Sequence, residues 1–209
     1  MSTREAIAAH YKLADSTDSI IRLESHARAS LSALYGKLGF KLGAEIGVWE
    51  GQHAEWICQM APKLELLCID GWERFAVKSG YHSPVRCVRA RQKAEQRLAK
   101  YKATILPMLT DEAAALVPDR SLDFIFIDAS HGFDDVMRDL LLWVPKVKPD
   151  GIISGHDYET TVMGWPAENG VKEAVHAYIG AHGISPLYLL MGTARDRWKS
   201  YFWVNDITA

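Results

Sequence analysis

The chain has 209 residues, 48% of them hydrophobic, and a formal net charge of −2. This length is typical of one domain, and the apolar content is enough for a full core. The nearly balanced charge argues against nucleic acid as an obligatory partner. The chain contains no apolar run of about 18 residues and no apolar block near its start, so neither a membrane span nor a secretory signal is expected.

Three cysteines, Cys58, Cys68 and Cys87, form no Cys-x-x-Cys pair and cannot all be bridged. Cys58 and Cys68 lie in apolar segments, which predicts buried thiols. We therefore expect a reducing, cytoplasmic location.

The first 40 residues are predicted to be helical. One short helix is expected over residues 3–14. A second is predicted by apolar residues at intervals of three and four, with Gly39 at its end; these residues are Ile20, Leu23, Ala27, Leu31, Leu34 and Leu38. Residues 1–40 would then form an N-terminal helical extension that packs on a catalytic domain of residues 41–209.

Strands and helices are predicted to alternate through the rest of the chain. The segment Leu122–Ile127 has four consecutive large apolar residues, which suits a strand covered on both faces. The alternation predicts an α/β fold: a Rossmann-like, doubly wound, mostly parallel seven-stranded sheet with helices on both faces. Strands are expected near residues 43–48, 64–69, 103–108, 122–127, 151–154, 185–191 and 200–204, helices near 53–60, 85–101, 112–117, 133–144 and 167–182, and a long loop over 73–84.

The most informative segment is Ala44–Gly51, which reads as a strand end, a tight turn and a helix start. Gly47 and Gly51 allow a sharp turn and the close approach of a ligand, because neither has a Cβ atom. The following helix would direct free N–H groups and its positive dipole end at that ligand. The pattern favours a nucleotide-like cofactor, although the two glycines could also make a purely structural turn.

The spacing in this turn discriminates between cofactors. A dinucleotide fingerprint has glycines where this chain has Trp49 and Gln52, which argues against a nicotinamide cofactor. Glu45, two positions before Gly47, suits a cofactor with a positively charged amino group. The pattern Glu-x-Gly-x-x-x-Gly resembles the first motif of class I S-adenosylmethionine-dependent methyltransferases.

A second acidic residue supports an adenosine-containing cofactor. Asp70 follows the predicted strand over 64–69, at roughly the interval of 20 residues after the glycine turn at which a ribose diol is bound. Gly71 and Trp72 come next, and the Trp72 indole could stack on a purine. The alternative is that Asp70 is an ordinary turn residue.

Polar residues also follow two later strands. Asp128 and His131 come after the strand over 122–127, and His156 and Asp157 come after the strand over 151–154. Three interpretations stay open: carboxylates that hold a divalent cation, a histidine that acts as general base without a metal, and caps of the following segments. His156 suits Mg²⁺ poorly as a ligand and would indicate Mn²⁺, Fe²⁺ or Zn²⁺.

The runs Ile-Asp-Ala-Ser-His and Val-Lys-Pro-Asp-Gly-Ile-Ile-Ser-Gly-His-Asp-Tyr resemble the small-molecule and sugar O-methyltransferase branch of class I methyltransferases. The resemblance covers about residues 40 to 160. It implies that Glu45, Gly47 and Gly51 hold the methionine part of S-adenosylmethionine, that Asp70 holds the ribose, and that Thr110 and Asp111 lie near the adenine. In metal-dependent relatives an acidic or amide pair follows the fifth strand, where this chain has His156 and Asp157.

The resulting hypothesis is methyl transfer from S-adenosylmethionine to a hydroxyl of a small molecule or sugar, with Mg²⁺ or another divalent cation as a candidate cofactor. The alternatives are a nicotinamide-dependent oxidoreductase and a non-catalytic nucleoside-cofactor-binding protein.

We expect a small-molecule acceptor, no membrane partner and a homodimer contact at the tryptophan-rich C-terminal end. The basic run over 86–102 is interpreted as a solvated helix face rather than an RNA-binding surface. The predicted cofactor-binding residues are Glu45, Gly47, Trp49, Gly51, Asp70, Gly71, Trp72, Thr110, Asp111 and Asp128; the catalytic residues His131, His156 and Asp157; and the metal ligands Asp128, His156 and Asp157.

Overall fold

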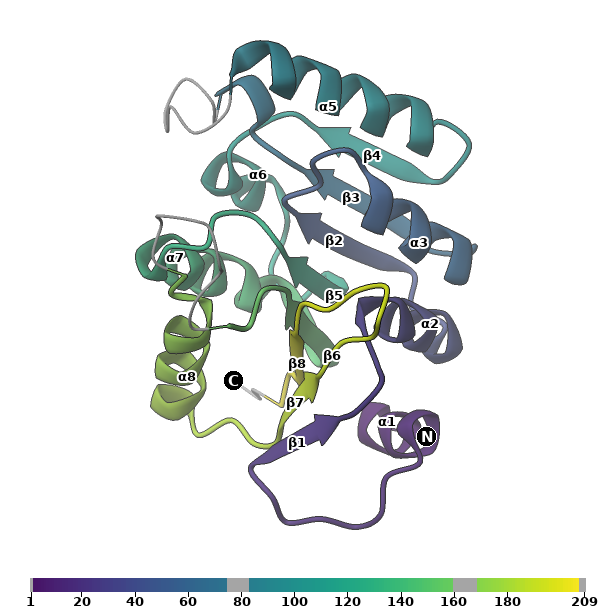
Figure 1. The fold of residues 1–209 in the computed structure, drawn as a ribbon, viewed down its shortest axis with the longest axis vertical. Coiled ribbons are helices and arrows are strands. Elements are labelled where there is room, and N and C mark those ends of the chain that lie inside the picture. Colours follow the sequence, from purple (N-terminus) through teal and green to yellow (C-terminus); the bar gives the residue numbers. More distant parts are fainter. Residues whose placement is uncertain (1, 75–82, 160–168, 207–209) are drawn as a thin grey trace.

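The computed structural model describes residues 2–74, 83–159 and 169–206. In this part of the chain, an eight-stranded sheet carries helices on both faces (Figure 1). The strands are β1 (Ile20–Leu23), β2 (Leu42–Ile46), β3 (Glu65–Ile69), β4 (Ala103–Leu106), β5 (Leu122–Ile127), β6 (Val147–Gly155), β7 (Leu187–Leu190) and β8 (Ser200–Val204). The helices are α1 (Thr3–Tyr11), α2 (Arg28–Leu38), α3 (Gln52–Met60), α5 (Pro84–Leu98), α6 (Thr110–Leu116), α7 (Phe133–Trp143) and α8 (Val171–His182), and the 3₁₀ turn η1 (Val144–Lys146) precedes β6.

The strand order is β1-β7-β8-β6-β5-β2-β3-β4. β8 runs antiparallel to β6 and β7, and the other neighbouring strands are parallel. The chain order reverses at β2, which has β3 on one side and β5 on the other. In open parallel sheets, ligands bind beyond the carboxyl ends of the strands at such a reversal.

The register brings the ends of the central strands to one level. Ile46 of β2 pairs with Ile69 of β3 and with Ile127 of β5, and Ile127 pairs with Gly155 of β6. The residues that follow these four positions therefore emerge together at one edge of the sheet.

Each face of the sheet has its own hydrophobic core. Helices α1, α2, α3 and α5 cover one face, and α6, α7 and α8 cover the other (Figure 1). Phe124 and Phe126 of β5 point to the first core, whereas Ile125 and Ile127 point to the second. All four side chains are buried, which confirms the interpretation of this apolar run as a strand covered on both faces.

The long helix predicted from Ile20 to Leu38 is wrong in its first part. Ile20–Leu23 is strand β1, which pairs in parallel with β7 at the edge of the sheet, and the helix begins only at Arg28. Intervals of three and four also occur by chance across a strand and a turn, and the β-branched pair Ile20-Ile21 favours a strand. Among the described residues the sheet therefore has eight strands rather than seven, and the N-terminal segment predicted to be helical contributes one of them. Gly39 ends α2 in the left-handed conformation, as predicted.

The remaining elements lie within about four residues of their predicted ends. The loop predicted over 73–84 lies mostly outside the described residues. Cys58 and Cys68 are buried free thiols, as expected. None of the helices in the described ranges is both long and apolar enough to cross a membrane.

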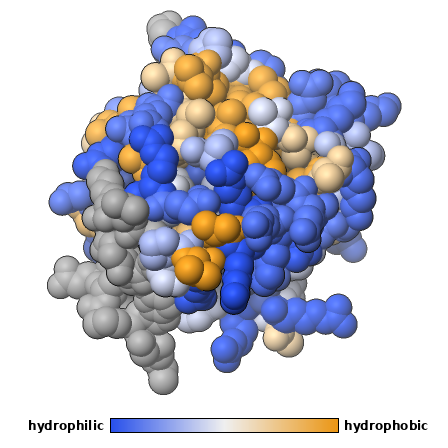
Figure 2. Space-filling model, turned by 90° about the horizontal axis from the view of Figure 1, so that it is seen from above, coloured by the Kyte–Doolittle hydropathy of each residue, from blue (hydrophilic) through white to orange (hydrophobic). Residues whose placement is uncertain are grey.

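The face seen from above carries a group of apolar side chains near its upper middle, with mostly hydrophilic side chains around it (Figure 2). Part of the basic run seen in the sequence is neutralised by glutamates. Ion pairs join Arg91 to Glu95, Lys93 to Glu50, and both Arg97 and Lys100 to Glu55.

Candidate active site

A cavity of about 600 Å³ lies at the carboxyl edge of β2, β3 and β5. This size is typical of sites for small molecules. Three predicted site residues, Gly51, His156 and Asp157, are not among the described residues that line it. The predicted residues that do line it are Glu45, Gly47, Trp49, Asp70, Gly71, Trp72, Thr110, Asp111, Asp128 and His131.

The two glycines of the turn have different structural roles. Gly47 has a φ of 94°, and a Cβ atom there would lie 2.1 Å from the carbonyl oxygen of Asp128. Only glycine therefore allows the turn to approach the end of β5 so closely. Gly51 has a φ of 76° and precedes α3, and a Cβ atom there would lie 3.1 Å from Cα of Ala94 in α5. Gly51 thus permits close packing of α3 and α5.

Glu45 is a buried acid near the carboxyl end of β2, with only 1% of its surface exposed. Its Oε1 atom lies 3.0 Å from Nδ1 of His53, and Nε2 of His53 lies 3.3 Å from Oγ of Ser32. Burial raises the pKa of Glu45 to about 8 and lowers the pKa of His53 to about 3. The Oε2 atom of Glu45 has no hydrogen-bond partner among the described residues. A ligand in the cavity can supply that missing donor.

Asp70 joins the two loops that flank the ribose position predicted from the sequence. Its Oδ2 atom accepts a hydrogen bond from the backbone N–H of Trp49 (2.8 Å), and Oδ1 accepts one from that of Trp72 (2.7 Å). The Trp72 indole N–H also donates to the carbonyl of Trp49 (2.9 Å). Both tryptophans have positive φ angles, 49° and 33°, which these bonds help to hold. Trp72 is 1% exposed, so its indole mainly braces the loops.

The start of α6 lies at the other end of the cavity. The hydroxyl of Thr110 donates to Asp139 (2.6 Å) and accepts from the Trp143 indole N–H (2.8 Å), so it is engaged within the protein. Asp111 is exposed in the first turn of the helix. Asp139, which the sequence analysis did not single out, also lines the cavity, and burial raises its pKa to about 6. The one feature of the sequence that could have indicated Asp139 is its position as an acidic residue on the apolar face of the helix that became α7.

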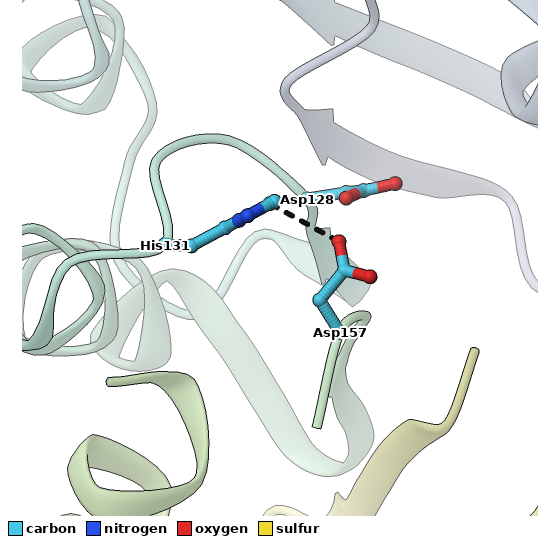
Figure 3. Close-up of side chains that lie close together, drawn as sticks. All are labelled: Asp128, His131 and Asp157. Carbon is cyan, nitrogen blue, oxygen red and sulfur yellow. Dashed lines mark ion pairs between the residues drawn. The ribbon is translucent and has the colours of Figure 1, made fainter. Parts of the chain in front are cut away.

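The polar residues after β5 and β6 form one cluster. Nε2 of His131 lies 3.1 Å from Oδ2 of Asp157, and Nδ1 of His156 lies 3.3 Å from the same oxygen. Figure 3 shows His131 and Asp157 pointing toward one another from two different loops, with Asp128 beside them. The backbone of Asp157 has a φ of 53°, an uncommon conformation for a residue with a Cβ atom.

The acidic and basic side chains of this cluster shift one another's pKa values. The hydrogen bond to Asp157 raises the pKa of His131. Burial opposes a charge on His156, but the attraction of Asp128 and of the neighbouring carboxylates is stronger and raises its pKa to about 9. Burial likewise opposes the charge on Asp157, yet hydrogen bonds from both histidines hold the pKa of its carboxyl well below the usual range.

Two further members of the cluster were missed by the sequence analysis. Arg28, the first residue of α2, donates from Nη1 to Asp128 (3.0 Å) and from Nε to Asp196 (3.0 Å). Asp196 lies in the loop between β7 and β8, and its Oδ1 atom is 3.7 Å from Nε2 of His156. Neither residue belongs to a local motif, because the contacts join residues that are 40, 100 and 168 positions apart in the chain. No signal in the sequence could have identified them.

Asp128, His131 and Asp157 could hold a divalent cation. Among the residues that the structure describes, these three offer ligand atoms that all lie within 4.8 Å of one another. The sequence analysis had placed His156 with the two carboxylates. His156 is instead buried behind them, with Nδ1 3.8 Å from Asp128, whereas His131 faces the cavity. A donor set of two carboxylates and one imidazole fits Mn²⁺, Fe²⁺ or Zn²⁺ better than Mg²⁺.

Residues 44–158, more than half of the chain, match a family described as a methyltransferase domain. The chain belongs to this family, which confirms the class of protein predicted from the sequence. No curated protein matches the sequence of the chain.

Solved structures of similar fold cover nearly the whole chain. An O-methyltransferase of Streptomyces achromogenes involved in tomaymycin synthesis, in complex with S-adenosylmethionine (SAM), is 16% identical with a TM-score of 0.60, and the match covers 97% of this chain and 89% of that one. An O-methyltransferase of Bacillus cereus in complex with SAH is 14% identical with a TM-score of 0.62, and the match covers 96% and 87%. At these identities the likeness establishes the fold alone.

Proposed function

We propose that this methyltransferase transfers the methyl group of S-adenosylmethionine to a hydroxyl group of a small molecule. The observation that carries the proposal is the continuous cavity that joins the glycine turn and Asp70 to the polar cluster at His131. The ligands named for the two similar structures, SAM and SAH, support the same cofactor here.

The cavity offers groups suited to each part of this cofactor. The free Oε2 atom of Glu45 would accept a hydrogen bond from the ammonium group. The Asp70 carboxylate accepts hydrogen bonds from backbone N–H groups and has acceptor capacity left for a ribose hydroxyl. Asp111 would lie near the adenine. The sulfonium is a good leaving group, so the protein has mainly to position the acceptor and to remove its proton.

His131 is the residue that we assign as general base. It faces the cavity, and its ring is oriented by the hydrogen bond that Nε2–H donates to Asp157. A base must be unprotonated to act, so we expect the rate to rise as the pH passes the pKa of His131. A divalent cation held by Asp128, His131 and Asp157 would instead lower the pKa of the acceptor hydroxyl.

Calorimetric titration with S-adenosylhomocysteine and with NAD tests the cofactor assignment. We expect S-adenosylhomocysteine to bind and NAD not to bind. A bound ammonium group would favour the charged form of Glu45. Glu45→Gln should therefore weaken the binding of S-adenosylhomocysteine about tenfold, because a neutral amide attracts the ammonium group less than a carboxylate does. Glu65→Gln, at an exposed position of β3, is the control. Binding of NAD alone would overturn the proposal.

The hydroxyl acceptor is tested separately with S-adenosylmethionine that carries a labelled methyl group. The label should appear on the oxygen of at least one compound in a panel of phenols and sugars. Transfer only to amine or thiol analogues would contradict the assignment of a hydroxyl acceptor.

A further inference from the structure

Arg28 brings a cation to the cavity from a segment that precedes the family match at residues 44–158. Its side chain is 22% exposed and lines the cavity. The hydrogen bonds to Asp128 and Asp196 use two of the five N–H donors of the guanidinium. Donors on Nη1 and Nη2 therefore remain for a ligand, because no other described residue accepts from them.

The guanidinium of Arg28 is close enough to Glu45 to favour the charged form of that acid. The same stretch of the cavity thus carries a cation with spare donors and a buried acid with an unpartnered oxygen. The Trp56 ring lies 6.0 Å from Cζ of Arg28 and limits the positions open to the guanidinium. An α-amino acid, which carries an ammonium and a carboxylate group on one carbon, is complementary to such a pair.

We propose that Arg28 binds the carboxylate of the cofactor's amino-acid tail while Glu45 binds its ammonium group. The inference rests on the proposed function, and it identifies a binding residue that the glycine turn and the strand ends do not supply. A guanidinium fork and a carboxylate match in shape and charge, so the contact would fix the tail in one orientation. The N-terminal segment would then complete the cofactor site.

The experiment compares two ligands that differ only in the carboxylate: S-adenosylhomocysteine and its decarboxylated analogue, which keeps the amine. We expect Arg28→Gln to weaken S-adenosylhomocysteine about tenfold or more and to leave the analogue within about twofold. Arg28→Lys keeps the charge but loses the fork, so its effect on S-adenosylhomocysteine should be intermediate. Isothermal titration calorimetry supplies the dissociation constants.

Equal weakening of both ligands would overturn the inference, because it would indicate a general disturbance of the cavity. Unchanged binding of S-adenosylhomocysteine would overturn it as well and would point to a carboxylate of the acceptor. Arg89→Gln, an exposed arginine of α5 outside the cavity lining, is the matched control, and circular dichroism checks the fold. If the wild-type protein binds neither ligand, the proposed function itself fails. If the wild type binds both and Arg28→Gln does not distinguish them, only this inference fails.

Discussion

Gly47 is the residue at which the backbone of the turn after β2 lies against the end of the neighbouring strand β5. We expect Gly47→Ala to lower the free energy of unfolding by at least about 2 kcal/mol, since a left-handed residue with a Cβ atom is strained and the new atom would overlap Asp128. The same displacement should weaken cofactor binding. Urea denaturation and ligand titration measure the two effects.

Gly39→Ala is the matched control for the backbone strain. Gly39 also has a positive φ, 68°, but a Cβ atom there would meet nothing within 4 Å. We expect this variant to lose about 1 kcal/mol and to bind the cofactor normally. A Gly47→Ala variant no less stable than Gly39→Ala would contradict the close approach to Asp128.

At the scale of elements, the loops after β5 and β6 bring His131 and Asp157 together across a gap of 25 residues in the chain. If His131 is the general base and Asp157 orients it, His131→Ala should lower kcat about a hundredfold or more. Asp157→Ala should add little to the loss in the double variant, because the two residues act as a unit. A double-mutant cycle of kcat with an accepted substrate measures this coupling, and fully additive losses would argue against the pair.

The pH dependence of the rate and the effect of a chelator on it distinguish a general base from a bound metal ion. Asp157→Ala removes the hydrogen bond that raises the pKa of His131, so the rise in rate should move to lower pH, toward the ordinary value of 6.5. Treatment with a strong chelator should leave the rate of the wild type unchanged if His131 is the base. A rate that is lost on chelation and restored by Mn²⁺ would favour the cation at Asp128, His131 and Asp157.

At the scale of the whole molecule, the cavity lies where β2 separates the two halves of the sheet. A ligand there contacts loops that follow β2, β3, β4 and β5, so it should stabilise the domain as one unit. S-adenosylhomocysteine at a hundred times its dissociation constant should raise the free energy of unfolding by about 2.7 kcal/mol. Chemical denaturation with and without the ligand checks this value, and the absence of any stabilisation would exclude specific binding to the native state.

The cytoplasmic location, the homodimer and the domain boundary at residue 40 stay predictions.

The sequence by itself determined the features that depend on neighbours in the chain. The apolar run of β5 indicated a strand covered on both faces, because such a run has no polar side to expose. The turn at Gly47 was predictable because only glycine permits that close approach, and Asp70 because it directly follows a buried strand. These local signals were sufficient for the fold class and for the position of the cavity.

The tertiary structure alone decided which side chains meet. Ile20–Leu23 is a strand because β7 offers an edge to pair with, and a helical spacing cannot reveal that partner. His131 faces the cavity while His156 is buried, which depends on how two loops pack rather than on either motif. Arg28 and Asp196 join the cluster from segments far apart in the chain, and such contacts form only when the whole sheet has assembled. Hydrogen bonds and ion pairs act over a few ångströms in space, so separation along the chain carries no information about them.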